Sequence, residues 1–424
     1  MSDFDARSLF VSMFDAAVAA ADPERTIRDH LPARPKGRTV VIGAGKGSAQ
    51  MARAFERAWD GPLSGLVVTR YGYAVACERI EVIEAAHPVP DDAGLAGARR
   101  LFETVSGLTG DDLVVALISG GGSALLPSPA GALTLGDEVA VNRALLASGA
   151  PIAAMNAVRK HVSSIKGGRL AAACHPARVV SLIVSDIPGD QPSLVSSGPT
   201  VPDASTRADA LAIIDAYRME LPAAVMAHLN SAQADAPVPD DPVFAQNKVR
   251  VIASAAQSLD AAAVVARAAG FEPVILSDAI EGEAREVAKV HAAIAREVAL
   301  KDRPFRRPAA ILSGGETTVT LRGKSGRGGR NGEFLLSLAL GIEGLEGVRA
   351  FAADTDGIDG SERNAGAFAD WTSVNRLRAA GFDARALLNA NDSWGAFDAL
   401  GDLFQPGPTG TNVNDLRVML VGRP

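Results

Sequence analysis

Short apolar runs that pass directly into glycine turns, with longer helical patterns between them, are the feature that most limits what this chain can fold into. The runs are rich in Val and Ile and apolar at consecutive positions, which is typical of strands buried between helical layers. Their alternation with helices indicates an α/β fold with a parallel sheet. In the first half we expect strands at Thr39–Ile42, Leu66–Thr69, Ile80–Ala85, Leu113–Ile118 and Val179–Val184. In the second half we expect them at Val249–Ala253, Pro273–Leu276, Ala309–Leu312, Val348–Ala352 and Arg417–Val421.

The length of the chain and one irregular segment suggest two domains. A chain of 424 residues is long enough for two or three domains of ordinary size. The segment Ser231–Pro242 contains three prolines and three aspartates and has no helical or strand periodicity, which is typical of a linker. We therefore predict two α/β domains, over residues 1–240 and 241–424, of which the second is the smaller.

Charge and cysteine content limit the partners and the compartment. The chain has 42 Lys and Arg against 49 Asp and Glu, so it lacks the basic excess of a nucleic-acid-binding protein. Its two cysteines cannot form a disulfide framework, its N-terminus lacks a basic leader, and no uncharged apolar run is long enough to span a membrane. We expect a cytoplasmic protein that binds neither nucleic acid nor membranes, and the sequence leaves monomer and homodimer open.

The first glycine-rich loop follows the strand at Thr39–Ile42 and opens a helix. It contains Gly43, Gly45, Lys46 and Gly47. A glycine turn between a strand and a helix N-terminus points backbone N–H groups at an anion. The loop departs from the P-loop pattern because Val40 replaces its first glycine, and from the dinucleotide fingerprint because Ser48 replaces its third. Anion binding is the favoured interpretation, and a tight turn with a solvated lysine is the alternative.

A second loop, after the strand at Leu113–Ile118, is suited to phosphate. It consists of Ser119, Gly120, Gly121, Gly122 and Ser123. Three consecutive glycines leave their amide groups unshielded, and the two serines add hydroxyl groups. We expect phosphate binding here rather than a plain flexible turn, because flexibility at the end of a buried strand is costly.

Polar residues farther along the first half suggest an anion site and a metal site. One segment holds an amide and four cations within an acidic protein, namely Asn156, Arg159, Lys160, Lys166 and Arg169. Such a concentration suits an anionic small molecule, although a solvated basic helix face has the same composition. Asp186 and Asp190 follow the strand at Val179–Val184 and could hold Mg²⁺, or could be the solvated acids of a turn.

In the second half, charged residues again follow strands or open helices. Glu316 follows the strand at Ala309–Leu312. Arg327, Arg330 and Asn331 lie on a glycine loop that opens a helix, where arginines are suited to clamp oxyanions.

Three carboxylates follow the strand at Val348–Ala352, at Asp354, Asp356 and Asp359. They lack the twelve-position spacing of a calcium loop, so we interpret them as a magnesium or general-base site. Thr409 and Asn412 belong to a further polar loop near the C-terminus.

Taken in order, these motifs resemble the glycerate 2-kinase family. In the first half the matching stretches are VVIGAGKGS, ISGGGSALL, NAVRKHVSSIKGGRLA, SDIPGD and SGPTVPD. In the second half they are LSGGETTVT, GRGGRNGEF, DTDGIDG, NDS and GPTGTNVNDL. They span nearly the whole chain. Two departures are Gly332, where relatives commonly have Gln, and the stretch 361–364, where Thr-Asp is commoner; neither changes the interpretation.

The resemblance implies a Rossmann-like N-terminal domain with a mostly parallel sheet and a smaller α/β C-terminal domain of the MOFRL type. It also implies ATP-dependent phosphorylation of D-glycerate at its 2-hydroxyl, giving 2-phospho-D-glycerate, with Mg²⁺ and in a cleft between the domains. Lys46, Arg330 and Asp356 match catalytic residues of the family, and Asp356 would either accept the hydroxyl proton or hold Mg²⁺. The metal would be held by Asp186, Asp190 and Asp354, and the substrates by the other loop residues named above.

Two other functions stay open on the sequence. One is an NAD(P)H-dependent hydroxypyruvate reductase, a name that some relatives carry. The first glycine loop supports it, and Arg70 could hold the 2′-phosphate of NADPH, but the fingerprint is incomplete and no His–carboxylate pair is evident. The other is a non-catalytic module in which two α/β domains close on an anionic metabolite.

Overall fold

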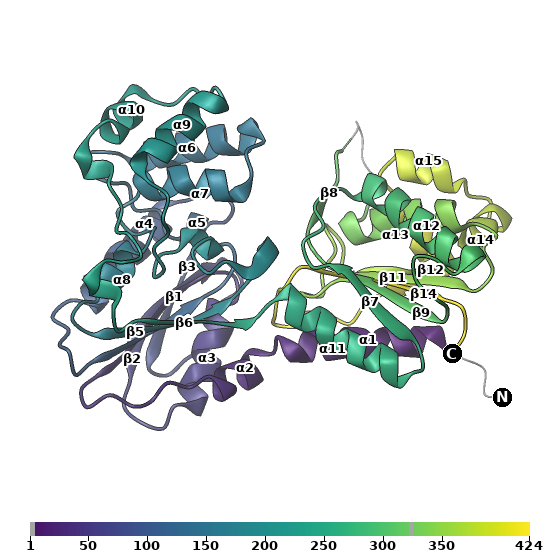
Figure 1. The fold of residues 1–424 in the computed structure, drawn as a ribbon, viewed down its shortest axis with the longest axis horizontal. Helices are drawn as coiled ribbons and strands as arrows, with labels where there is room; N and C mark the ends of the chain where they lie inside the picture. The colour runs from purple at the N-terminus through teal and green to yellow at the C-terminus, as the bar shows by residue number, and fades with distance from the viewer. Residues whose placement is uncertain (1–4, 322–325) are drawn as a thin grey trace. The chain divides into compact units, whose positions relative to one another are not determined.

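The computed structural model describes residues 5–321 and 326–424, and the chain divides into two compact units (Figure 1). The first unit is Pro23–Ile252. The second unit consists of Ala253–Pro424 together with the N-terminal segment up to Asp22. Within the described residues, no helix is both long and apolar enough to cross a membrane.

The first unit is built on a six-stranded sheet in the order β3-β2-β1-β4-β5-β6. Its strands are β1 (Thr39–Ala44), β2 (Ser64–Arg70), β3 (Ile80–Ala85), β4 (Leu113–Ile118), β5 (Arg178–Val184) and β6 (Lys248–Ala253). The pairs β1–β2, β2–β3, β1–β4 and β4–β5 are all parallel. β1 and β4 are buried along their whole length, as expected for strands covered on both faces. The predicted Rossmann-like sheet is confirmed.

Helices of the first unit form two groups. Those near the sheet are α2 (Pro23–Asp29), α3 (Ser48–Ala58), α4 (Asp92–Thr104), α5 (Gly122–Leu125) and α8 (Arg169–Ala173). A separate lobe, which lies above the sheet in Figure 1, consists of α6 (Leu135–Ser148), α7 (Ile152–His161), α9 (Arg207–Ala216) and α10 (Ala223–Leu229). The lobe has its own apolar core around Leu145, Val158 and Ile214, which the sequence did not predict.

The second unit contains a mixed sheet in the order β13-β12-β11-β14-β9-β7. Its strands are β7 (Glu272–Ser277), β9 (Ala309–Ser313), β11 (Val348–Asp354), β12 (Gly366–Asp370), β13 (Leu403–Phe404) and β14 (Asp415–Val421). β7 and β9 are parallel, whereas β14 is antiparallel to both β9 and β11, and β12 is antiparallel to β11. The parallel architecture expected from the alternation of strands and helices is therefore wrong for this half. A separate ribbon pairs β8 (Gly282–Glu283) with β10 (Thr317–Thr318).

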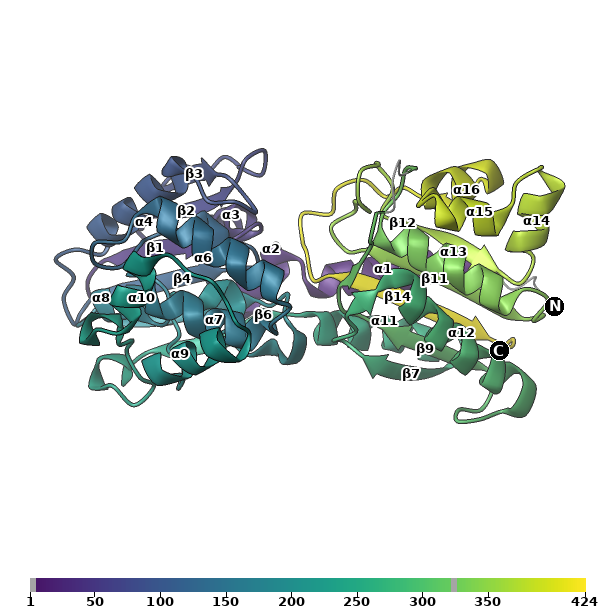
Figure 2. The same ribbon diagram turned by 90° about the horizontal axis from the view of Figure 1, so that it is seen from above.

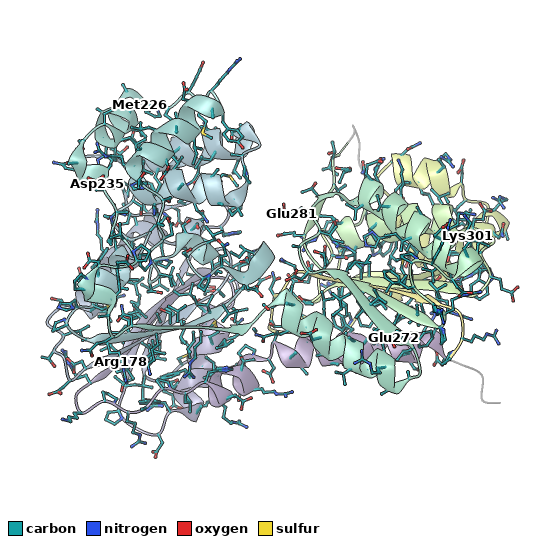
Figure 3. The ribbon with its side chains drawn as sticks, viewed as in Figure 1. Arg178, Met226, Asp235, Glu272, Glu281 and Lys301 are labelled. Carbon is teal, nitrogen blue, oxygen red and sulfur yellow. The ribbon has the colours of Figure 1, made fainter. Side chains whose placement is uncertain are left out.

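Helices cover both faces of the second sheet, as Figures 1 and 2 show. One face is covered by α1 (Ala6–Ala20) and α11 (Ala255–Ala268). The other face is covered by α12 (Ala284–Lys301), α13 (Arg330–Ile342), α14 (Ser373–Ala379), α15 (Ala384–Asn389) and α16 (Ser393–Leu400). Within each unit, side chains fill the space between sheet and helices (Figure 3).

The units differ from the predicted domains 1–240 and 241–424 at both ends of the first domain. Helix α1 packs in the second unit, where the rings of Phe10 and Phe14 lie 5.6 and 6.1 Å from that of Phe351. Its apolar face is therefore buried against a sheet formed by distant parts of the chain. At the other end, β6 joins the sheet of the first unit, so the predicted linker Ser231–Pro242 lies inside that unit.

Candidate active site

The strand order places the two predicted glycine loops of the first unit at one position. From β1 the chain proceeds outward to β2 and β3 and then returns to the other side of β1 at β4. In open α/β sheets, ligands bind beyond the carboxyl ends of the strands at such a reversal. The loop around Lys46 follows β1, and the loop Ser119–Ser123 follows β4, so both flank this point.

Hydrogen bonds join the two loops into one platform. The Lys46 amide donates to the Gly120 carbonyl over 2.8 Å, and the Gly47 amide donates to Ser119 Oγ over 2.9 Å. Gly121 has a φ of +83°, in the left-handed region that favours glycine, and it precedes the short helix α5. The glycines therefore serve a fixed backbone geometry.

Lys46 lies over the second loop beside a neutral histidine. A Cβ atom at Gly121 would be 3.0 Å from Lys46 Cγ and 3.1 Å from His87 Nε2, so both side chains cover the same glycine. Burial, together with the positive charges of Lys46 and Arg70, lowers the pKa of His87 to about 4. Among the residues that the structure describes, no carboxylate forms a salt bridge with Lys46. The ammonium group is therefore available to a ligand.

Two serines that the sequence did not identify as site residues hold the second loop from the side. Ser196 Oγ accepts the Gly122 amide over 2.9 Å and donates to the Ser119 carbonyl over 2.6 Å. Ser197 Oγ donates to Asn156 Oδ1 over 2.9 Å. Both serines have positive φ angles, 53° and 60°. Such strained residues cost about 1–3 kcal/mol each and tend to cluster at functional sites.

A pocket of about 220 Å³ opens beside the second loop. Its polar wall includes His87, Ser123, Asn142, Asn156, Arg159 and Asp186. Asn142 comes from α6, and Asn156 and Arg159 from α7, so the helical lobe forms one side of the pocket and the loops of the sheet form the other.

The predicted basic segment does not act as one cluster. Of its four cations, Arg159 alone is among the described residues that line the pocket. Lys160, which is 1% exposed, forms an ion pair with Asp203, and Lys166, which is 2% exposed, forms one with Glu138. Carboxylates of the fold therefore already neutralise Lys160 and Lys166, which were expected to hold a substrate anion.

The two aspartates after β5 have different positions. The Asp186 carboxylate lies directly against Gly120, where an added Cβ would overlap it, and it lines the pocket. Asp190 ends a short 3₁₀ turn and is not among the described residues of the pocket wall. Within the described residues, 5–321 and 326–424, no group of three or more His, Cys, Asp or Glu side chains could hold a metal ion. Mg²⁺ often takes only one or two protein carboxylates, so Asp186 alone fits such a partial set.

In the second unit, three carboxylates surround Arg330 at the start of α13. Its Nε, Nη1 and Nη2 atoms lie 2.8, 3.0 and 2.6 Å from oxygens of Asp415, Glu316 and Asp354. These acids lie at one edge of the sheet because β14 starts where β9 and β11 end. Burial alone would lower the pKa of Arg330, but the three carboxylates outweigh burial and raise it.

Asp415 and Arg417, at the start of β14, complete this cluster and were not predicted as site residues. Fully buried Asp415 accepts from Arg330 and, over 2.8 Å, from Asn331 Nδ2, and it forms an ion pair with Arg417. Arg417 is 1% exposed and also donates to the Gly314 carbonyl over 3.0 Å. Opposite charges two residues apart on one face of an apolar strand are the signal that would have revealed them.

Asp354 is engaged by protein groups at both oxygens. Its Oδ2 accepts from Arg330, and its Oδ1 accepts the Asp356 amide over 3.1 Å. Burial raises its pKa well above the ordinary value, although Arg330 opposes this shift. A cation bonded at 2.6 Å disfavours a second one on the same carboxylate, so the expected Asp354–Mg²⁺ contact does not fit this arrangement.

The other two aspartates of this segment differ in exposure. Asp356 is half-buried, and its Oδ1 accepts the Ile358 amide over 2.8 Å. Asp359 caps α13, because it accepts the amides of Asn331 and Gly332 over 2.9 and 2.8 Å. Burial raises the pKa of Asp359 to about 6, against the effect of these two hydrogen bonds. Asp359 is therefore a structural acid, whereas Asp356 stays accessible.

The remaining predicted residues of the second unit shape its loops. Arg327 lies 3.4 Å above the ring centroid of Trp394. Thr409 Oγ1 donates to the Thr355 carbonyl over 2.5 Å. Asn412 Oδ1 accepts the Asn414 amide over 3.1 Å, which fixes the turn before β14.

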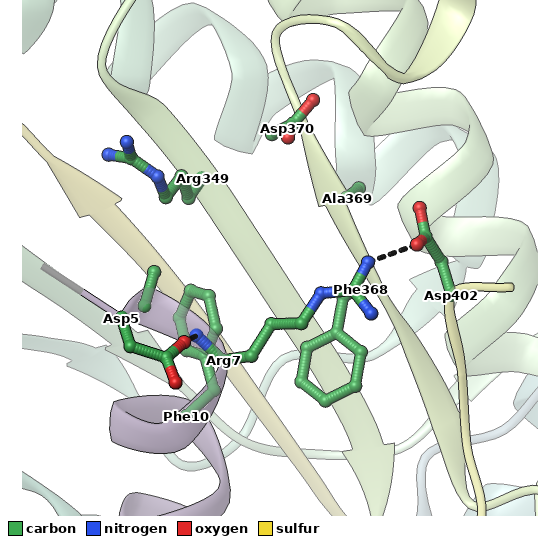
Figure 4. A pocket seen from close by; sticks show the side chains of 9 residues that line it. Asp5, Arg7, Phe10, Arg349, Phe368, Ala369, Asp370 and Asp402 are labelled. Atoms are coloured by element: carbon green, nitrogen blue, oxygen red, sulfur yellow. Dashed lines mark hydrogen bonds and ion pairs between the residues drawn. The ribbon is translucent and has the colours of Figure 1, made fainter. Parts of the chain in front are cut away.

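A second pocket of about 220 Å³ lies at the opposite edge of the same sheet, because Arg349 in its wall is the second residue of β11 whereas Asp354 is the last. Figure 4 shows Arg7 extending from α1 to Asp402 across this pocket. Asp402, whose side chain is 2% exposed, also pairs with Arg376 over 2.8 Å. These ion pairs attach α1 to the sheet, and we assign them a structural role.

Comparison with known proteins agrees with this architecture. Residues 9–230 match the family described as Domain of unknown function (DUF4147), and residues 309–415 match the MOFRL family. A D-glycerate 2-kinase from Thermotoga maritima is 38% identical over 418 residues, which cover 98% of this chain and 98% of that protein. This chain belongs to the glycerate 2-kinase family.

Other relatives of this family extend along the whole chain. A protein of Agrobacterium vitis that carries a provisional hydroxypyruvate reductase name is 54% identical and covers 99% of this chain and 96% of its own length. The crystal structure of a glycerate kinase from Thermotoga maritima matches with a TM-score of 0.88 at 37% identity, over 98% of this chain and 99% of that one. The resemblance predicted from the motifs is confirmed, and so is the prediction of an enzyme of the glycerate kinase type.

Proposed function

We propose that the protein transfers the γ-phosphoryl group of ATP to the 2-hydroxyl of D-glycerate, giving 2-phospho-D-glycerate and ADP. The observation that carries this proposal is the pair of glycine loops at the reversal of the first sheet, with Lys46 above them. Phosphoryl transfer depends on positioned amides and positive charge around the phosphates more than on covalent chemistry. The full-length relative named D-glycerate 2-kinase supports the choice of substrate.

In this reaction the glycerate 2-oxygen bonds to the γ-phosphorus while the bond from that phosphorus to the β,γ-bridging oxygen breaks. The hydroxyl proton leaves at the same stage. We assign the phosphate contacts to Lys46 and the loop amides, and the proton to the accessible carboxylate Asp356. Asp356 as a ligand of Mg²⁺ is the alternative role.

We also assign Arg330 a contact with the transferred phosphoryl group. Its buried partners Asp415 and Asp354 contact Nε and Nη2, while the third partner, Glu316, contacts Nη1 and has a side chain that is 53% exposed. A phosphoryl oxygen that displaces Glu316 would meet a guanidinium already oriented by two acids. This exchange would stabilise the negative charge of the transition state.

The residues present fit Mg²⁺ only in part. Mg²⁺, when bound, would neutralise charge on the phosphates of ATP. Asp186 is the residue that would hold it, since its carboxylate faces the pocket beside the second glycine loop. Phosphate oxygens and water would complete the shell.

The residues of this proposal come from both units, since Lys46 and the loop amides belong to the first unit and Arg330 and Asp356 belong to the second. We propose the cytoplasm as the setting.

A reductase is the second candidate, because the relative at 54% identity carries that name. Its cofactor fingerprint is incomplete at Ser48. Arg70, the expected ligand of a 2′-phosphate, instead lies 4.2 Å above the ring centroid of Tyr73.

One assay separates the two functions. The protein is incubated with D-glycerate, ATP and Mg²⁺ while ADP is followed, and separately with hydroxypyruvate and NADPH while NADPH absorbance is followed. We expect ADP formation that depends on D-glycerate, and no NADPH oxidation. NADPH oxidation without ADP formation would overturn the kinase proposal in favour of the reductase.

A further inference from the structure

Arg159 differs from the other cations of its segment in how its charge is compensated. Lys160 and Lys166 each pair with a buried or half-buried carboxylate. Arg169 donates to backbone carbonyls, among them that of Asp235 over 2.9 Å. Arg159 forms no salt bridge with any carboxylate of residues 5–321 and 326–424, although burial lowers its pKa. A guanidinium in this state is stabilised by an anion from outside the fold.

Two amides hold this guanidinium in a fixed orientation. Arg159 Nε donates to Asn142 Oδ1 over 2.9 Å, and its Nη1 donates to Asn156 Oδ1 over 3.1 Å. Asn156 is itself fixed, since its Nδ2 donates to the Leu194 carbonyl over 2.9 Å. These contacts use Nε and Nη1, and Arg159 lines the pocket. The remaining nitrogen, Nη2, can donate a charge-assisted hydrogen bond to a carboxylate oxygen.

The opposite wall of the pocket is suited to hydroxyl groups. Asp186 lies there against Gly120, and neutral His87 lies against Gly121 beside Lys46. A carboxylate can accept from a hydroxyl, and a neutral imidazole can either donate or accept. The pocket thus offers a cationic end on the helical lobe and hydroxyl partners at the glycine loop.

The volume of the pocket suits a small ligand better than a whole nucleotide. Pockets that enclose drug-sized ligands usually measure about 300–1,000 Å³, whereas this one measures about 220 Å³. A three-carbon hydroxy acid is small enough for this volume, and it carries both a carboxylate and hydroxyl groups.

We infer that this pocket is the acceptor subsite, in which Arg159 binds the carboxylate of a 2-hydroxy acid while its hydroxyl groups face the glycine loop. The inference rests on the proposed function and deepens it by placing the hydroxy acid in the first unit. The ATP phosphates then occupy the platform around Lys46, next to the acceptor hydroxyl.

Direct binding to the full-length protein tests this inference. Calorimetry measures the affinity for D-glycerate, for its neutral analogue glyceramide and for Mg²⁺–ADP, with wild type, Arg159→Gln and Arg159→Lys. We expect Arg159→Gln to weaken D-glycerate binding by about 10- to 100-fold, the range for loss of one charge-assisted contact. Glyceramide and Mg²⁺–ADP should bind as in wild type. Arg159→Lys should recover part of the loss, because it restores the charge without the fork.

Arg143→Gln is the matched control, because Arg143 is an exposed cation of α6 that does not line the pocket. It should bind D-glycerate as wild type does. Thermal melting of each variant identifies loss of the fold. Unchanged D-glycerate affinity in a folded Arg159→Gln variant would overturn the inference, as would selective loss of Mg²⁺–ADP binding, which would assign Arg159 to a phosphate. A wild type that does not bind D-glycerate also overturns it.

Two outcomes distinguish a failure of the proposed kinase function from a failure of the acceptor subsite. If wild type binds D-glycerate through Arg159 but forms no ADP from ATP, the subsite stands and the kinase reaction does not. If ADP forms and the KM for D-glycerate is the same in Arg159→Gln, the reaction stands and the subsite does not.

Discussion

Replacing Arg330 with methionine should destabilise the second unit in a pH-dependent way. The change removes three contacts at once, those to Asp415, Glu316 and Asp354 at 2.8, 3.0 and 2.6 Å. The side chains of Asp354 and Asp415 are 6% and 0% exposed, so two acids lose a cation in a buried site. Glu316 is mostly in solvent, and its pair contributes little.

The magnitude follows from this geometry. Removing one partner of a buried ion pair costs about 3–5 kcal/mol. The lower end of that range applies here, because Asp415 keeps Arg417 and Asn331 as partners. We therefore expect a loss of about 3 kcal/mol at pH 8, which for a unit of this size lowers the melting temperature by about 6–12 °C.

The sign of the pH dependence follows from Asp354. Its pKa in the folded state is raised, by burial first and then by Asp356 and Asp415, against the effect of Arg330. Without Arg330 it rises further. A raised folded pKa means that the folded state binds more protons than the unfolded state, so stability falls as pH rises above the unfolded pKa of about 4. The deficit of Arg330→Met should therefore be smaller at pH 5 than at pH 8.

Denaturant unfolding at pH 5, 6.5 and 8 measures this effect in wild type, Arg330→Met and the double variant Arg330→Met/Asp354→Asn. The double variant should recover stability at pH 8, because it removes the uncompensated charge. Arg327→Met, on the same loop but with a side chain that is 55% exposed, is the matched control and should lose less than about 1 kcal/mol. An Arg330→Met protein as stable as wild type at pH 8, or a deficit that neither pH nor Asp354→Asn changes, would refute this reasoning.

Three further changes separate catalytic from structural residues of the first unit. Lys46→Ala should lower kcat by about 10²–10³-fold with little change in melting temperature, since Lys46 forms no salt bridge with the described residues; wild-type kcat would remove it from the catalytic machinery. Lys166→Met should instead lower the unfolding free energy by about 3–5 kcal/mol, because it leaves Glu138 buried and unpaired, and an unchanged denaturation midpoint would contradict that role. Gly120→Ala should abolish turnover while the protein stays folded, because the added Cβ overlaps the Asp186 carboxylate; near-normal turnover would show that the position of Asp186 is not needed.

The strands of this protein could be predicted from the sequence, whereas the strand directions of the second sheet could not. All ten expected strands are present, from β1 to β14, because short runs rich in Val and Ile favour strands. Strand direction depends on which connections cross the sheet. β12 carries Gly and Ala rather than Val or Ile and was missed, and β12 and β14 both run antiparallel to β11.

Contacts between residues that are distant in the sequence explain the remaining differences between the sequence predictions and the structure. The apolar face of α1 is visible in its sequence, but its partner Phe351 lies more than 300 residues away, so its unit could not be assigned. Lys160 and Lys166 looked like Arg159 because their partners Asp203 and Glu138 lie 43 and 28 residues away. Spacing along the chain shows which cations are near one another, and only the fold shows which are already paired.

The identity of the reaction product is the most direct test of the central claim. The full-length protein is incubated with D-glycerate, ATP and Mg²⁺, and the product is analysed by ³¹P and ¹³C NMR. We predict stoichiometric ADP and a phosphate ester on carbon 2 of glycerate, with no product from Lys46→Ala on the same time scale. A phosphate ester on carbon 3, or no phosphorylated glycerate from an active preparation, would contradict the account.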